Sequence, residues 1–159
     1  MKIPVTLNEM PFTFDTTPSE KLVSALRREK ILSVKNSCNT KTCGGCYILL
    51  DDKVIASCHI PVGLVKNSKI ITLEHFSKTE FYSDIIKGFD KAGISLCGYC
   101  NAGKVFLAYE IIKNISQPTR EIISNYINHL NDCCVEKDTL VNGILYAYRT
   151  FPVVIFALG

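Results

Sequence analysis

The sequence predicts an α+β fold in two parts, and three observations support this prediction. In the first half, short alternations of apolar and polar residues with the period of strands flank one helical segment and one cysteine-rich loop. From about residue 77, apolar residues recur every three or four positions, as in amphipathic helices. Eight cysteines in 159 residues fall into two groups, one in each half. We therefore expect one domain over residues 1–76 and a second over residues 77–159.

The N-terminal elements begin with a hairpin and a helix. Residues 2–7 and 11–14 alternate around Asn8-Glu9, which predicts two antiparallel strands joined by a tight turn. The segment from Thr17 to Glu20 reads T-P-S-E, a capping box with proline at the first helical position. It predicts a helix that continues to about Lys30 and lays an apolar stripe across the hairpin.

A second hairpin and a last strand complete the first half. Residues 47–50 and 53–57 alternate around Asp51-Asp52, and residues 69–73 form one more apolar run. The order is then hairpin, helix, cysteine loop, hairpin and strand. That order is typical of a β-grasp domain of the plant-type ferredoxin kind.

The cysteine loop carries the strongest chemical signal in the chain. Cys38, Cys43, Cys46 and Cys58 are separated by gaps of four, two and eleven residues. The first two gaps are those of plant-type 2Fe–2S sites, in which the fourth cysteine lies further along the chain. Gly44 and Gly45 have no side chains, so the loop can turn tightly and direct backbone N–H groups at the sulfurs. The pattern predicts one 2Fe–2S cluster.

Other uses of these cysteines fit the pattern less well. Structural zinc sites usually come as two close pairs of ligands, and disulfides need an oxidising compartment. Residues 1–12 have neither the apolar run nor the small-residue cleavage site of a secretory signal, so we expect a cytoplasmic protein with reduced thiols. A net charge of +3 without a basic, aromatic-rich run argues against nucleic acid as a partner. No apolar run approaches the roughly 20 residues of a membrane helix, which argues against membrane insertion.

Four helical stripes in the second half predict a small helical bundle. They consist of Phe81, Ile85 and Phe89; of Val105, Ala108, Tyr109 and Ile112; of Ile122, Tyr126 and Leu130; and of Leu140, Ile144 and Tyr148. The S-K-T-E segment from Ser77 to Glu80 is another capping-box pattern. Gln117-Pro118-Thr119 separates the second helix from the third.

The second group of cysteines lies between these predicted helices. Cys97 and Cys100 lie between the first and second helices, and Cys133 and Cys134 lie between the third and fourth. A Cys-x-x-Cys pair alone is compatible with a redox disulfide, a zinc site or a cluster. Adjacent cysteines do not easily bind one ion, although each could reach a different iron of a dinuclear cluster. Otherwise, one of the two is a spare thiol.

Together with these motifs, several longer segments resemble the small iron–sulfur subunit of the molybdenum hydroxylases, the group of xanthine, carbon monoxide and nicotinate dehydrogenases. The segments are LRREKILSVKNSC, CNTKTCGGC, IITLE, AGISLCGYCNAG and PTREI. The resemblance covers nearly the whole length, from Val5 to about Tyr148. It implies a chain that does no substrate chemistry and carries single electrons from a molybdenum cofactor through two 2Fe–2S clusters to FAD.

The resemblance also assigns ligands and partners to the two halves. The first cluster would be held by Cys38, Cys43, Cys46 and Cys58 and would face an FAD-binding medium subunit. The second would be held by Cys97, Cys100, Cys133 and Cys134 and would face a molybdopterin-binding large subunit.

The second cluster motif departs from the family pattern. Where the family has Gly-Asn-Leu-Cys-Arg-Cys-Thr-Gly-Tyr, residues 129–137 read HLNDCCVEK. One helical count places Asn131 and Cys133 at the two ligand positions, another places Asp132 and Cys134 there, and only a shifted register uses both cysteines. Two other functions are therefore compatible with the sequence. One is a divergent paralogue with one intact cluster that acts as an assembly or interaction subunit, and the other is a free-standing ferredoxin.

Overall fold

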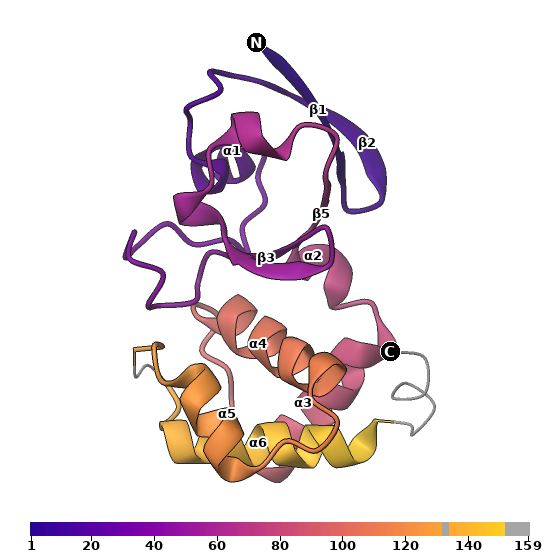
Figure 1. Cartoon of the computed structure of the whole chain (residues 1–159), viewed down its shortest axis with the longest axis vertical. Coiled ribbons are helices and arrows are strands. Elements are labelled where there is room, and N and C mark those ends of the chain that lie inside the picture. The colour runs from indigo at the N-terminus through magenta and orange to yellow at the C-terminus, as the bar shows by residue number, and fades with distance from the viewer. Residues whose placement is uncertain (132–133, 152–159) are drawn as a thin grey trace.

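The computed structural model describes residues 1–131 and 134–151, and its elements fall into two groups (Figure 1). The first group consists of β1 (Lys2–Leu7), β2 (Met10–Asp15), α1 (Leu22–Arg28), β3 (Tyr47–Leu50), β4 (Lys53–Ala56), the 3₁₀ helices η1 (Ser57–His59) and η2 (Val62–Val65), and β5 (Lys69–Ile71). The second consists of α2 (Leu73–Phe76), α3 (Glu80–Lys91), α4 (Asn101–Asn114), α5 (Arg120–Ile127) and α6 (Lys137–Thr150). The fold is therefore mixed α+β, as the sequence predicts.

The strands form one five-stranded sheet in the order β2-β1-β5-β3-β4. β1 and β5 pair in parallel, and the other neighbours are antiparallel. Both turn residues of the first hairpin have positive φ (Asn8 51°, Glu9 68°), as do those of the second (Asp51 49°, Asp52 67°). Two-residue type I′ turns need this conformation, and Asn and Asp tolerate it better than most residues. Both predicted hairpins are confirmed.

The start of α1 differs from the prediction. The helix begins at Leu22 after Lys21, which makes no side-chain cap hydrogen bond, and it ends at Arg28. The segment before it is held by another part of the chain, because the backbone N–H groups of Val62 and Gly63, both in η2, donate hydrogen bonds to the carbonyls of Glu20 and Pro18. These contacts fix residues 17–20 as a turn, so the capping-box prediction is wrong.

The helical half confirms four long helices and corrects some of their details. Thr79, and not Ser77, caps α3 by accepting a hydrogen bond from the N–H of Tyr82, because α2 already occupies residues 73–76 and the last strand stops at Ile71. In α5 the residue at 122 is 39% exposed, while Ile123 is fully buried. The predicted apolar stripe of this helix is therefore shifted by one position.

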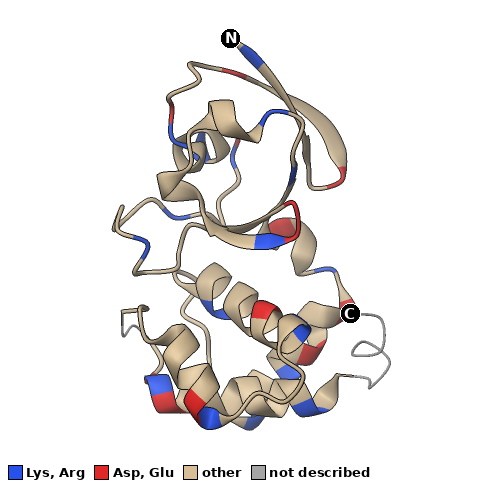
Figure 2. Cartoon of the chain, viewed as in Figure 1, with Lys and Arg blue, Asp and Glu red and all other residues tan. Residues whose placement is uncertain are grey.

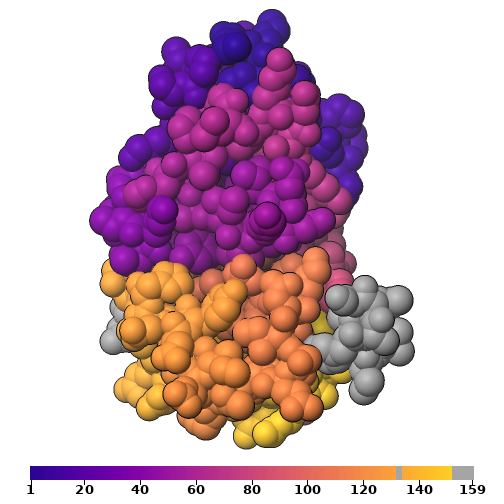
Figure 3. Space-filling view, viewed as in Figure 1, coloured from indigo at the N-terminus to yellow at the C-terminus, as the bar shows by residue number. Residues whose placement is uncertain are grey.

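Helix α4 lies between the sheet and helices α3, α5 and α6 and is buried along most of its length (Figure 1). Its buried residues join the sheet core and the helical core into one continuous hydrophobic cluster. On the face shown in Figure 3, the two halves meet along a broad boundary. At the far side of the bundle α3 and α6 cross very closely, which the absence of a side chain on Gly88 allows. A Cβ on Gly88 would lie 2.3 Å from the backbone nitrogen of Ala147.

Charged residues of both signs are interspersed over the two halves in the view of Figure 2. None of the helices in the described part of the chain has the length and apolar character needed to cross a membrane.

Candidate metal centres

The first cysteine loop is shaped by residues with left-handed backbone conformations. Asn39, Lys41 and Gly44 have φ values of 52°, 66° and 72°. The resulting turns direct donors at the sulfurs, because the N–H of Thr40 donates to Cys38 Sγ over 3.4 Å and the N–H of Gly45 donates to Cys43 Sγ over 3.4 Å. These are the sulfur-directed N–H groups that the two adjacent glycines led us to expect.

The fourth cysteine of this group lies beside the loop. Cys58 is in η1 at the end of β4, and the preceding Ser57 donates hydrogen bonds from its N–H (3.1 Å) and its hydroxyl (2.6 Å) to the carbonyl of Cys46. Cys46 and Cys58 are both buried, and Cys38 and Cys43 are partly exposed. The strand end thus places Cys58 next to Cys46, and within the loop Cys38 lies next to Cys43.

The pKa values of two thiols in this group are shifted in opposite directions. Burial opposes ionisation of Cys38, but hydrogen bonds from Thr40 and Cys43 outweigh it and lower the pKa of the thiol to about 5. Burial, reinforced by the neighbouring sulfurs of Cys58 and Cys43, raises the pKa of Cys46 to about 12. Cys46 is in an environment that disfavours an isolated thiolate, and a bound cation would compensate its negative charge.

The second group of thiols is drawn together from two separate connections between helices. Cys97 Sγ and Cys100 Sγ are 3.4 Å apart, and Cys100 Sγ and Cys134 Sγ are 3.7 Å apart. All three sulfurs lie within 4.8 Å of one another. Two thiolates on one tetrahedral metal with bonds of about 2.3 Å would lie roughly 3.7 Å apart. The spacing and the soft donor set fit a thiolate-bound metal.

The surroundings of the second group also suit an anionic centre. Burial opposes ionisation of Cys97, but hydrogen bonds from the backbone N–H groups of Cys100 and Tyr99 outweigh it and lower its pKa to about 6. Burial raises the pKa of Cys134. The ammonium of Lys104, itself only 5% exposed, donates to Cys100 Sγ over 2.7 Å. A buried cation next to these sulfurs is compatible with a group that carries negative charge.

The alternative ligands at residues 131–134 are only partly within the described chain. Asp132 and Cys133 lie outside the described residues. The backbone N–H of Asn131 donates to the carbonyl of Thr42 over 2.7 Å, and its side-chain amide donates to Thr42 Oγ1 over 3.1 Å. The side chain of Asn131 is thus bound to the first cysteine loop, whereas Cys134 lies with the second group.

Comparisons with known proteins identify the family of the chain. A family described as a 2Fe–2S binding domain matches residues 72–144. The xanthine dehydrogenase iron–sulfur-binding subunit of Escherichia coli O157:H7 is 34% identical over 103 residues, which are 65% of each chain. The nicotinate dehydrogenase small FeS subunit of Eubacterium barkeri is 30% identical over 77% of this chain and 78% of its own length. The chain belongs to the small iron–sulfur subunits of the molybdenum hydroxylase family.

Solved structures support the same family. The crystal structure of quinoline 2-oxidoreductase from Pseudomonas putida 86 contains a chain that matches with a TM-score of 0.82 and 26% identity, over 94% of both chains. The aldehyde oxidoreductase of Desulfovibrio desulfuricans matches with a TM-score of 0.79 and 27% identity over 92% of this chain. This chain covers only 17% of that much longer protein.

The two cysteine-bearing segments of this chain contact each other through glycines. A Cβ on Gly103, in the first turn of α4, would lie 2.6 Å from Cα of Gly44 in the first cysteine loop. A Cβ on Gly45 would similarly lie 3.3 Å from the carbonyl oxygen of Tyr99. Backbone therefore packs directly on backbone between the two cysteine segments, and only glycine permits this approach.

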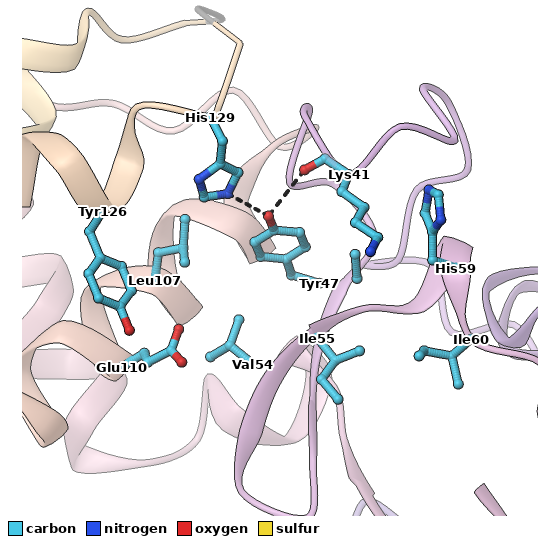
Figure 4. A pocket seen from close by; sticks show the side chains of 11 residues that line it. Lys41, Tyr47, Val54, Ile55, His59, Ile60, Leu107, Glu110, Tyr126 and His129 are labelled. Carbon is cyan, nitrogen blue, oxygen red and sulfur yellow. Dashed lines mark hydrogen bonds between the residues drawn. The ribbon is translucent and has the colours of Figure 1, made fainter. Parts of the chain in front are cut away.

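Beside this contact, a cavity of about 400 Å³ lies between the β3–β4 hairpin and helices α4 and α5 (Figure 4). The hydroxyl of Tyr47, the residue after Cys46, donates to the carbonyl of Lys41 over 3.1 Å and shares a 2.8 Å hydrogen bond with His129 Nε2. Burial and the nearby cysteine sulfurs raise the pKa of Tyr47. Glu110 lines the same cavity, and burial raises the pKa of its carboxyl.

Sequence reasoning missed three residues that now belong to the two sites. Tyr47 and His129 join segments 82 residues apart, and no local pattern indicates such a pair. The sequence does contain a signal for Lys104. It is the one charged residue in the apolar run AGKVFLA, which begins two positions after Cys100. A lysine on an otherwise buried helix face needs a partner, and the nearby cysteines were the obvious candidates.

Proposed function

We propose that this chain is the electron-transfer subunit of a molybdenum hydroxylase complex, passing single electrons from the molybdenum cofactor through two 2Fe–2S clusters to FAD. In this proposal residues 1–76 are a β-grasp, plant-type ferredoxin-like domain, and residues 77–159 are a four-helix domain. The first cluster is held by Cys38, Cys43, Cys46 and Cys58. The second is held by Cys97, Cys100, Cys133 and Cys134.

The proposed partners follow from the family to which the chain belongs. An FAD-binding medium subunit faces the first cluster, and a molybdopterin-binding large subunit faces the second. The complex is cytoplasmic, and its substrate is bound by the molybdenum subunit. The names of the similar proteins support this assignment, since one is described as the iron–sulfur-binding subunit of a xanthine dehydrogenase and another as the small FeS subunit of a nicotinate dehydrogenase.

The observation that carries the proposal is the backbone contact between the two cysteine segments at Gly44 and Gly103. Bound 2Fe–2S clusters supply one-electron carriers, and electron transfer between carriers needs them to be close. The chain's own residues provide the rest. Cysteine thiolates supply the ligands, the N–H groups of Thr40, Gly45 and Tyr99 donate to sulfurs, and the burial of Cys46, Cys58 and Cys100 limits access of water.

The test uses the full chain purified without oxygen. Two clusters predict about four irons and four acid-labile sulfides per chain, and two distinct electron paramagnetic resonance signals after reduction. They also predict co-purification with flavin- and molybdopterin-containing subunits when the chain is isolated from its natural source. A chain without bound iron, or an intact complex without molybdopterin, would contradict the proposal.

A second candidate is a divergent paralogue with one intact cluster, acting as an assembly or interaction subunit or as a free-standing ferredoxin. It is favoured by the exposure of Cys97 and Cys134, in contrast to the buried Cys46 and Cys58 of the first group. It predicts about two irons per chain and one paramagnetic signal. The same iron analysis therefore distinguishes the two candidates.

A further inference from the structure

Lys104 is an unusual residue for its position in the fold. It lies in the first turn of α4 with its side chain 5% exposed, between the fully packed neighbours Gly103 and Val105. Its Nζ is 2.7 Å from Cys100 Sγ. The ion pairs found among the described residues do not include Lys104. Within that part of the chain, its recorded hydrogen-bond partner is a sulfur.

Two physical effects make a cation at this position costly. Removing an ammonium from water costs several kcal/mol unless a negative group compensates it. The N-terminus of a helix also carries a partial positive charge, so the first turn of α4 disfavours a lysine. Both penalties are offset if Cys100 and its neighbours carry negative charge, and three sulfurs within 4.8 Å of one another form such a group when they bind a metal as thiolates.

We propose that Lys104 is the counter-charge of the second cluster, and that its ammonium raises the reduction potential of the cluster held by Cys100. This inference rests on the proposed function. A 2Fe–2S centre with four thiolates is an anion, and its reduction adds one more negative charge. A fixed positive charge next to a ligand sulfur stabilises the reduced form more than the oxidised form. Net charge and hydrogen bonds to the sulfurs are among the factors that set the potentials of these clusters.

The first cysteine group has no equivalent cation in hydrogen-bond contact with its sulfurs, within the residues that the structure describes. The groups that donate to these sulfurs include the backbone N–H groups of Thr40 and Gly45, and the hydroxyl of Ser37 shares a hydrogen bond with Cys43 Sγ; all of these groups are neutral. Lys104 therefore acts selectively on the second site. Its effect is to make that cluster the better acceptor of an electron from the donor subunit than the same thiolates would be alone.

The experiment is a redox titration of the full chain followed by electron paramagnetic resonance. The signal of the second cluster is identified by its loss in Cys97→Ser. Lys104→Met removes the charge and the donor, Lys104→Gln removes the charge and leaves a neutral N–H donor on a shorter side chain, and Lys104→Arg keeps both charge and donor. Lys113→Met is the matched control, because it removes an exposed charge near the other end of the same helix.

In Lys104→Met the second cluster is expected to become at least tenfold harder to reduce, a fall of about 59 mV for one electron. Lys104→Gln is expected to show a smaller fall, and Lys104→Arg little change. The first cluster's potential should move less than the second's in every variant. Equal potentials of the second cluster in Lys104→Met and Lys113→Met, with iron content retained, would overturn the inference.

Iron content keeps the test decisive if a variant does not retain the second cluster. Loss of about two irons in Lys104→Met and Lys104→Gln, but not in Lys104→Arg, would support the counter-charge, because only the charged side chain would keep the site filled. Loss in all three variants would overturn it. If the wild-type chain itself binds only about two irons, the proposed second cluster fails, and the role of Lys104 fails with it.

Discussion

The two cysteine groups are built by different means. The first is a single loop closed by one 3₁₀ turn, and half of its thiols are buried against the sheet. The second is assembled from the α3–α4 and α5–α6 connections, and Cys97 and Cys134 are exposed. The first group receives neutral hydrogen-bond donors and the second a buried ammonium. The comparison teaches that a site formed within one local segment can be recognised from spacing, whereas a site assembled by helix packing depends on contacts that spacing does not show.

The largest expected effect tests whether the first group is also the more important one for folding. We expect Cys43→Ser to abolish the signal of the first cluster and to lower the thermal stability of the sheet half, because metal binding contributes to the folding of a site formed around it. Cys97→Ser should remove only the second signal, with a smaller fall in stability because its side chain is exposed. Iron content and thermal unfolding followed by circular dichroism measure both effects.

Ser37→Ala is the matched control for Cys43→Ser. It removes a hydroxyl 3.4 Å from Cys43 Sγ and leaves every cysteine in place, so the cluster spectrum should be retained. An unchanged absorption spectrum in Cys43→Ser would remove Cys43 from the ligands. Equal losses of stability in Cys43→Ser and Cys97→Ser would remove the difference between the two groups.

The next effect concerns the contact that joins the two groups. In Gly103→Ala the added Cβ would lie 2.6 Å from Cα of Gly44, so α4 must move away from the first cysteine loop. We expect a loss of about 1–3 kcal/mol in the free energy of unfolding, as for overpacked cores, together with weaker magnetic coupling between the clusters. Urea unfolding and electron paramagnetic resonance test these two results.

Gly93→Ala separates steric overlap from backbone strain in this test. Gly93 has a φ of 74°, and a Cβ there would meet nothing within 4 Å, so only the strain of a left-handed alanine remains, about 1 kcal/mol. The magnetic coupling between clusters should be unaffected. If Gly103→Ala leaves the coupling unchanged as well, the glycine contact does not set the separation of the sites.

Much of the fold could be predicted because its signals are local. The two hairpins were recognised from alternation and from Asn-Glu and Asp-Asp turns, and Thr119 does cap α5 just after the proline that separates two helices. The failures have a common physical cause. The T-P-S-E segment has the pattern of a helix cap, yet the η2 region binds its carbonyls and keeps it as a turn. Tertiary hydrogen bonds outweighed a local preference worth about 1 kcal/mol.

The two candidate sites likewise differ in how much of each could be predicted from local sequence. Cys58 was expected beside the first loop because a strand end brings it back, and its neighbour Ser57 binds the carbonyl of Cys46. For the second group, the sequence left the choice among residues 131–134 open. The structure puts the Asn131 side chain on Thr42 and puts Cys134 beside Cys100, which depends on how α5 and α6 pack. The spacing of residues along one helix contains no such information.

A smaller effect, which depends on pH, concerns the anchor of the first loop. Glu74 in α2 accepts hydrogen bonds from the N–H (2.8 Å) and hydroxyl of Ser33, shortly before the loop, and from the hydroxyl of Thr72. Burial opposes the carboxylate charge, but these hydrogen bonds outweigh it and lower the pKa of Glu74. We expect Glu74→Gln to cost about 1–2 kcal/mol of unfolding free energy at pH 7, allowing for its partly exposed position.

The sign of the pH dependence follows from the lowered pKa. The carboxylate stabilises the fold fully above the unfolded pKa of about 4.3, and this stabilisation is lost as the pH falls through the lower folded value. The difference between wild type and Glu74→Gln should therefore be constant from pH 7 to about 5 and shrink below about 4. Urea unfolding of both proteins at each pH measures it, and both carry the same cysteines, so acid loss of clusters affects them alike. A difference that grows in acid would contradict the assignment.

The smallest effect tests the polar link between the two halves at the cavity. Tyr47→Phe removes the hydroxyl that contacts His129 Nε2 and the carbonyl of Lys41, both near the surface where water can replace it. We therefore expect a loss of only about 1 kcal/mol, with both cluster signals retained. Tyr146→Phe on the exposed side of α6 is the matched control and should change the free energy of unfolding by less than about 0.5 kcal/mol. A Tyr47→Phe loss as small as that of the control would show that the glycine contact and the shared apolar core join the two cysteine groups without help from this hydrogen bond.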